Sequence, residues 1–458
     1  MNATPASRTK LFAVLLLILV AVVAYRAWQV YNAPPVVPGE SRFAQLEKQA
    51  AAGNADAQRA LGRMLQFKEE GTPENLPRAL ELYRAAAAQG HMRAQKDLGW
   101  AYQNGLGVAR DPAVAAQWYE KAAAQGEQWA QNNLGLMYKE GEGVPKNLAR
   151  AREWFEKSAA QGTDYAEYNL GQLYLRGEGV PQDTARAVEW MQKAADRGYM
   201  DALQELAAMY MGGNGVKQDE ERAVKLYTSA ATRGSAQAQY ALGSRYFADA
   251  DPAKKKQGLD LLTRAAAAGD ADARLMLGSL YLYGAQVPGD VPRGAGLLDG
   301  LLKDQEARQH HGAAATTAGV FFGSDGPSMD VPRAVAYFEK GVTEKYPDAF
   351  GFLAKLLGAG KGVPQDNART LALLGEGARL QDGRSMALLG LALAEGRYGL
   401  KRDPALGYAH VYLASEGPNP GSDVTETLAW LKGKLPAAEQ AKGIQLAKAA
   451  PQGTLPVR

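Results

Sequence analysis

The sequence predicts an all-α protein, a right-handed solenoid of two-helix repeats that follows an N-terminal membrane-targeting helix. Three observations predict this fold class. The 458 residues include 51 glycines and much alanine, whereas runs of strand-favouring Val, Ile and Thr are almost absent. A pattern of apolar residues recurs every 36 residues. Glycine and proline interrupt it at the same place in two successive units, in LGLMYKEGEGVPKN at 134–147 and LGQLYLRGEGVPQD at 170–183.

Residues 1–32 have the features of a membrane anchor. Arg8 and Lys10 precede an apolar run at 11–25. A helix of that run rises about 22 Å, less than the roughly 30 Å hydrocarbon core, but the stretch to Tyr31 completes the span. Basic residues before the span predict a cytoplasmic N-terminus and export of everything downstream. We therefore expect a single-pass protein of a bacterial inner membrane, with its repeats in the periplasm.

Cleavage of the same segment as a signal peptide is the alternative. Val22 and Ala24 offer small residues for a cleavage site, although the mature chain would then begin with Tyr25. Cleavage would leave a periplasmic or secreted protein. In either case, the proline-containing segment 33–43 is expected to be a semi-extended linker.

The first helix of each unit is predicted by three residues spaced four apart, which places them on one helix face. An alanine is followed by a leucine and then by a tyrosine. The alanines are Ala94, Ala130, Ala166, Ala202 and Ala238, and the leucines are Leu98, Leu134, Leu170, Leu206 and Leu242. A glycine follows most of these leucines, for example Gly135. Since a glycine inside a helix costs about 1 kcal/mol relative to alanine, its recurrence indicates close contact with a neighbouring helix.

A tight corner and a second helix complete each unit. Gly177 can end the first helix in the left-handed conformation, Gly179 allows a second turn, and Pro181 prevents the helix from resuming. The N-caps expected for the second helices are Asp111, Asn147, Asp183 and Asp219. Large residues such as Trp118 and Tyr119 then alternate with small ones. Two such helices cannot enclose a core alone, so neighbouring units must stack.

This pattern resembles the Sel1-like repeat, a relative of the tetratricopeptide repeat. The resemblance extends over a solenoid at 44–417. It is clearest at 94–234 and eroded at 57–90 and 238–417, which gives ten units in all. Residues 418–458 are expected to form two closing helices, with Asp423 and Glu426 as a capping box.

The sequence predicts no catalytic, cofactor or metal site. The absence of cysteine excludes disulfides, thiolate metal sites and cysteine nucleophiles. His310 and His311 are adjacent, so on a helix their side chains diverge by about 100° and are poorly placed to share a metal. The corner glycines lack the lysine that follows in a phosphate-binding loop. A net charge of +3 does not favour nucleic acid.

The remaining candidate is the surface of the first helices, where the variable positions form a polar wall with some aromatic groups. The candidate partner-binding residues are Gln95, Trp100, Gln131, Asn133, Tyr168, Gln172 and Arg176. The resemblance implies an adaptor or scaffold that binds other proteins, with a possible place in envelope assembly. A glycan- or peptidoglycan-binding protein is the alternative, because Trp and Tyr can stack on sugars, and a β-lactam-binding enzyme is a further one. The sequence specifies neither the partner nor the oligomeric state.

Overall fold

The computed structural model describes residues 41–69, 73–284, 286–417, 420–450 and 455, and this part of the chain contains helices and no strand. The helices are α2 Arg42–Ala51, α3 Ala55–Phe67, α4 Leu76–Ala88, α5 Met92–Asn104, α6 Pro112–Ala124, α7 Gln128–Glu140, α8 Leu148–Ala159, α9 Asp164–Arg176, α10 Thr184–Asp196, α11 Met200–Gly212, α12 Glu220–Thr232, α13 Ala236–Phe247, α14 Pro252–Ala267, α15 Ala271–Tyr283, α16 Val291–Leu301, α17 His311–Gly323, α18 Val331–Thr343, α19 Pro347–Ala359, α20 Asn367–Arg379, α21 Gly383–Glu395, α22 Pro404–Ser415, α23 Ser422–Lys434 and α24 Ala437–Ala449, with short 3-10 helices η2 Gln305–His310 and η3 Arg397–Gly399. The predicted all-α repeat architecture is confirmed.

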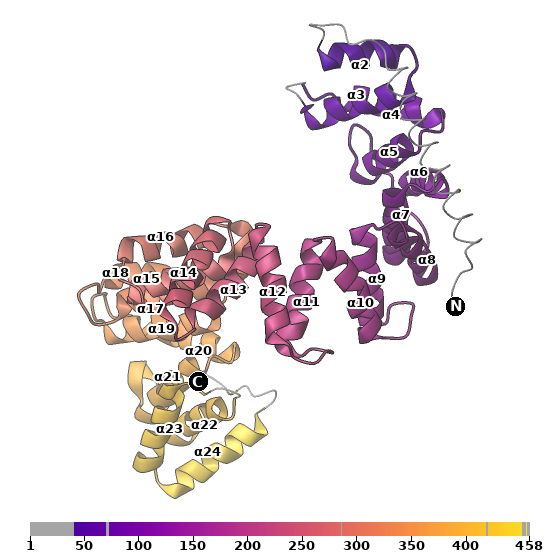
Figure 1. Ribbon diagram of the computed structural model, residues 1–458. Coiled ribbons are helices and arrows are strands. Elements are labelled where there is room, and N and C mark those ends of the chain that lie inside the picture. Colours follow the sequence, from indigo (N-terminus) through magenta and orange to yellow (C-terminus); the bar gives the residue numbers. More distant parts are fainter. Residues whose placement is uncertain (1–40, 70–72, 285, 418–419, 451–454, 456–458) are drawn as a thin grey trace. The chain divides into compact units, whose positions relative to one another are not determined.

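The chain divides into two compact units, with the division between Ala202 and Leu203 inside α11. In the first unit, each helix from α2 to α10 packs against the next one along the chain (Figure 1). In the second unit, the helices from α12 to α23 also pack in order, and α24 packs against α22. Helices α15, α17, α19, α21 and α23 form an additional row in which each contacts the next. Both units are therefore stacks of helical hairpins.

The hairpin corners have the predicted chemistry. Gly177 and Gly179 have φ values of 69° and 71°, the left-handed region that glycine enters most readily. The Gly177 N–H donates to the Leu173 carbonyl and ends α9, while Asp183 accepts from the backbone N–H of Arg186 at 3.0 Å and begins α10. The other predicted N-caps, Asp111, Asn147 and Asp219, accept in the same way at 3.0, 3.0 and 2.9 Å.

Some predictions near the ends of the chain are corrected by the structure. Helix α2 begins at Arg42, so it includes the last two residues of the linker predicted at 33–43. The capping box at Asp423 and Glu426 is wrong, because α23 begins earlier, with Gly421 as its N-cap. Asp423 instead lies in the first turn of α23 and forms an ion pair with Arg384 at 2.9 Å.

The predicted membrane anchor at 1–32 lies outside the described residues. Within the described ranges, no helix combines the length and the apolar character needed to cross a bilayer.

Candidate functional site

The buried seams between the repeats determine which side chains of the first helices remain available for binding. After several repeat alanines comes a residue that reaches back to the end of the preceding helix. Gln131 donates to the Ala123 carbonyl at 3.1 Å and accepts from Gln161 at 2.8 Å. Gln95 makes the equivalent bonds with the Ala87 carbonyl at 3.2 Å and with Gln125 at 2.7 Å. These glutamines hold successive repeats together.

The same positions carry a charged pair at the next seam. Glu167 stands where Gln131 stands one repeat earlier, and Arg197 stands where Gln161 does. The Arg197 Nε donates to Glu167 Oε2 at 3.1 Å, and the Glu167 residue is only 2% exposed. Burial raises the pKa of the Glu167 carboxyl, and the charge of Arg197 opposes this rise.

The prediction that the seven candidate residues lie on an open surface is wrong for three of them, because Gln95, Gln131 and Gln172 are buried. Asn133 is half-buried and hydrogen-bonds the hydroxyl of Tyr119. These four side chains belong to the packing of the repeats. For Gln95 and Gln131, which directly follow a repeat alanine, spacing alone did not show that this position points along the stack and not towards solvent.

The other three predicted residues do reach the surface, but at different places. Trp100 is exposed and packs beside the Phe67 ring, with centroids 6.2 Å apart. Tyr168 lies half-exposed against Tyr199, with ring centroids 5.1 Å apart. Arg176 is exposed in the last turn of α9, where it lies 3.9 Å from Glu178. The structure thus does not bring Trp100, Tyr168 and Arg176 together in one cluster.

The site predicted from the sequence did not include two exposed aromatic residues of the first helices, Trp129 and Tyr165. We define the aromatic surface as Trp129, Tyr165, Tyr168 and Tyr199, which come from the start of α7, from α9 and from the link before α11. Trp129 and Tyr165 are 38% and 45% exposed, and their ring centroids are 5.5 Å apart. The ring centroids of Tyr165 and Tyr199 are 4.7 Å apart. The sequence does contain a pattern that marks these two residues, because Trp129 and Tyr165 each directly precede a repeat alanine.

Beside the aromatic surface lies a basic groove, which we define by Arg59, Arg63, Arg93, Lys96 and Trp129. The groove has a volume of about 430 Å³ and is formed by α3, α5 and the start of α7, which stack in this order in the first unit (Figure 1). Arg93, Trp129 and part of Arg63 face solvent. Trp129 belongs to both features, so the groove and the aromatic surface are continuous.

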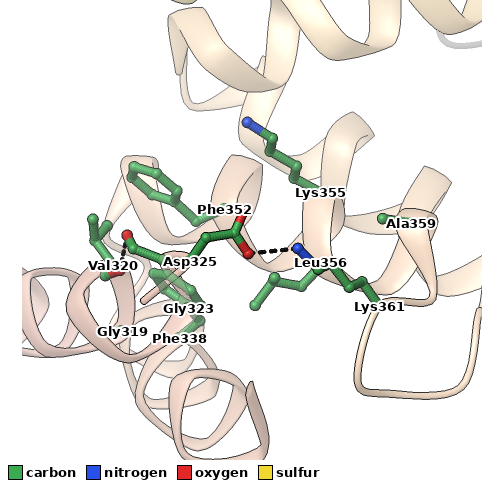
Figure 2. A pocket seen from close by; sticks show the side chains of 11 residues that line it. Gly319, Val320, Gly323, Asp325, Phe338, Phe352, Lys355, Leu356, Ala359 and Lys361 are labelled. Atoms are coloured by element: carbon green, nitrogen blue, oxygen red, sulfur yellow. Dashed lines mark hydrogen bonds and ion pairs between the residues drawn. The ribbon is translucent and has the colours of Figure 1, made fainter. Parts of the chain in front are cut away.

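The second unit has a smaller, more apolar pocket of about 350 Å³ between α17, α18 and α19 (Figure 2). Phe338, Phe352 and Leu356 supply its apolar walls. Asp325 and Lys361 form an ion pair of 2.5 Å at its rim. Figure 2 shows the amino group of Lys355 directed away from this pair.

A family model for the Sel1 repeat matches ten successive segments, which cover most of the chain: 55–91, 93–127, 130–163, 164–199, 201–235, 236–270, 271–298, 313–344, 352–382 and 383–419.

The chain belongs to the Sel1 repeat family.

Two solved structures are similar to this chain. A protective antigen of uropathogenic Escherichia coli strains, described as displaying an SLR fold, is 27% identical, with a TM-score of 0.50 over 92% of this chain and 100% of that one. A Sel1 repeat protein from Oxalobacter formigenes is 32% identical, with a TM-score of 0.48 over 56% of this chain and 99% of that one. No curated protein matches the chain at a significant level. The predicted resemblance to the Sel1-like repeat is confirmed.

Sel1 repeat proteins generally mediate contacts between proteins and are typically scaffolds without catalytic activity. The histidines of this Sel1 repeat protein bind neighbouring groups of the fold. His310 lies 3.1 Å from Asp272, whereas His311 is buried with its Nε2 2.9 Å from the Asp304 carbonyl. No group of three or more His, Asp or Glu side chains suited to a metal ion is present among the described residues.

Proposed function

We propose that this Sel1 repeat protein is a membrane-tethered adaptor that holds a partner protein on the first helices of residues 41–202, on the periplasmic side of a bacterial inner membrane. The aromatic surface carries the proposal. Trp129 and Tyr165 expose large rings in two successive repeats, and each ring is braced by a neighbouring ring. Rigid aromatic side chains supply much contact area for little loss of conformational entropy, which is why they recur as anchors of protein interfaces.

The tether is supported by the sequence of the N-terminal segment. Its basic residues and the apolar run 11–25 fit a helix that inserts with the N-terminus inside, and the prolines of 33–41 would hold the repeats away from the bilayer. Tethering raises the effective concentration of the adaptor for partners in the same membrane.

A pull-down from detergent-solubilised envelopes tests the adaptor. The full chain carries a C-terminal tag, and the test variant replaces Trp129 and Tyr165 by serine. The matched control replaces Tyr283 and Trp430, two aromatic side chains that are similarly exposed but lie in the second unit. We expect the test variant to lose a protein that the wild type and the control both retain. Equal retention by all three would contradict the adaptor.

Glycan binding is the second candidate, and the exposed rings of Trp129 and Tyr165 are the observation that favours it. Such rings can stack on sugars as well as on protein side chains. Sedimentation with purified peptidoglycan sacculi distinguishes the two, since a glycan reader pellets with sacculi and loses this property in the Trp129 and Tyr165 variant. An adaptor remains in the supernatant. Turnover of acyl or glycosyl substrates by the purified protein would contradict both candidates.

A further inference from the structure

We propose that the basic groove binds an acidic, extended segment of the partner protein, and that aromatic side chains in this segment continue onto the aromatic surface. This inference rests on the proposed adaptor function and adds the chemistry of what is bound. It starts from the side chains that line the groove. Four of them are cations, and the one carboxylate among them, Glu127, is buried.

Two carboxylates near the groove, Glu127 and Asp97, are already engaged by the fold. Glu127 accepts the backbone N–H of Ala130 at 2.6 Å and so caps α7. The Asp97 carboxylate lies 2.6 Å from Arg59 Nε and 2.5 Å from Lys96 Nζ, so these two cations share one carboxylate.

The other two cations of the groove are Arg63 and Arg93. Arg63 lies over the Phe67 ring, 5.6 Å from its centroid, and its one ion pair among the described residues is a longer, solvent-exposed pair with Glu69 at 3.4 Å. Such exposed pairs contribute little. Arg93 is exposed and forms no ion pair with any described residue. The groove therefore carries positive charge that the carboxylates of the described residues do not fully neutralise, and carboxylates of a partner are the protein groups that match it. Arginine binds carboxylates through two parallel hydrogen bonds.

The order of residue types along the repeats favours a peptide over a nucleic acid. Two residues after the repeat alanine, the side chain is Arg59 in the first repeat, Lys96 in the second and Tyr168 in the fourth. Along the first helices of residues 41–202, the side chain at this position thus changes from basic to aromatic. A nucleic acid is bound through a series of phosphate contacts along its length, whereas four cations followed by exposed rings suit a segment with a few acidic residues and adjacent aromatic ones.

Fluorescence anisotropy with the purified full chain in detergent tests the inference. The probe is a fluorescein-labelled peptide of Asp-Glu-Tyr repeated four times, compared with a neutral peptide of Asn-Gln-Tyr. We expect the acidic peptide to bind more tightly and its affinity to fall as salt is added. Replacing Arg63 and Arg93 by serine should weaken binding about tenfold, because two charge-assisted contacts are lost.

A matched control removes the same charge elsewhere in the same unit. Lys121 and Lys157 lie on the second helices α6 and α8, over the rings of Trp118 and Trp154 at 4.2 and 4.0 Å. Replacing Lys121 and Lys157 by serine should leave peptide affinity within about twofold of wild type, since groove contacts set the affinity more than net charge. Circular dichroism and thermal unfolding establish that both variants fold.

Three results would overturn the inference. The acidic and neutral peptides could bind alike, or the two double variants could weaken binding equally. A single-stranded DNA oligonucleotide of the same charge could bind as tightly, with the same dependence on Arg63 and Arg93, which would identify a general polyanion surface. If the envelope pull-down depends on Trp129 and Tyr165 but the acidic peptide does not bind, the adaptor stands and this inference alone fails.

Discussion

Single glycines inside the first helices set how closely each hairpin packs. A Cβ on Gly99 would lie 2.8 Å from the Tyr119 ring, and one on Gly135 would lie 2.6 Å from the Phe155 ring. The predicted reason for these glycines, close approach of the second helix, is confirmed. The large residue of the second helix occupies the space that the glycine leaves, which is how alanine-rich helices still bury aromatic side chains.

We expect Gly135→Ala to destabilise the protein by about 1 to 3 kcal/mol, because overpacking of the Phe155 ring outweighs the better helix propensity of alanine. Gly296→Ala is the control, since a Cβ there would meet no atom within 4 Å, and it should stabilise the protein by up to about 1 kcal/mol. Urea unfolding followed by circular dichroism measures both changes. A stabilising Gly135→Ala would show that the contact does not restrict the helix.

Asp382 provides a prediction about pH. This residue is only 4% exposed and caps α21, accepting the backbone N–H of Ser385 at 2.8 Å. Burial raises the pKa of its carboxyl, and the hydrogen bonds from Ser385 oppose the rise. Because the folded carboxyl binds its proton more tightly, its contribution to stability is complete below the unfolded pKa of about 3.9 and is lost as pH rises through the folded pKa.

Asp382→Asn removes this titration but keeps an acceptor for the cap. The free energy of unfolding of this variant should therefore rise relative to wild type as the pH increases from about 4 towards neutral. Asp111→Asn, at an exposed N-cap, supplies the baseline. Urea titrations over this pH range measure the difference. A difference between Asp382→Asn and wild type that does not change with pH would mean that burial of this carboxyl has no energetic effect.

At the scale of the helix pair, equivalent positions at two seams between repeats hold a hydrogen-bonded glutamine pair at one seam and an ion pair at the other. Gln131 with Gln161, and Glu167 with Arg197, occupy equivalent positions in successive repeats. We expect the double change Glu167→Gln with Arg197→Gln to stay within about 1 kcal/mol of wild type. Arg197→Gln alone should cost on the order of 2 kcal/mol, because it leaves a buried carboxylate without its cation. A double-mutant cycle by urea unfolding measures the coupling, and additive effects of the two changes would contradict it.

The helices and corners could be predicted from the sequence because they depend on local rules. Gly177, Pro181 and Asp183 act through their own backbone conformation or through a neighbour three residues away. The seams and the groove depend on contacts between residues some 30 positions apart, as for Gln131 with Gln161. A single repeat does not reveal which polar side chain faces the next repeat, so buried glutamines were taken for surface residues.

The basic groove was missed for a related reason. Arg59, Arg63, Arg93 and Lys96 are scattered through two repeats, and no local run of basic residues marks them. Only the stacking of α3, α5 and α7 brings these side chains to one place. The division of the chain after Ala202 also has no counterpart in the repeat pattern, which continues across it without a change of spacing.

At the scale of the whole molecule, the proposal requires the repeats to be exported and held at the membrane. A C-terminal fusion to alkaline phosphatase, which is active only after export, should be active, and the fusion protein should remain in the membrane fraction after carbonate washing. Deletion of residues 1–32 should abolish both properties, because the apolar run 11–25 is the proposed anchor. An inactive phosphatase on the full chain would contradict the periplasmic location, and release by carbonate would indicate cleavage of the segment.

The central claim is that partners are held on the first helices of residues 41–202. Site-specific photocrosslinking in intact cells tests it most directly, with benzoylphenylalanine placed at Trp129 or Tyr165 and, as the control, at the exposed Trp430 of the second unit. The account predicts that the positions of Trp129 and Tyr165 capture the same protein and that the position of Trp430 does not. Capture at Trp430 alone, or no captured protein at Trp129 and Tyr165, would contradict it.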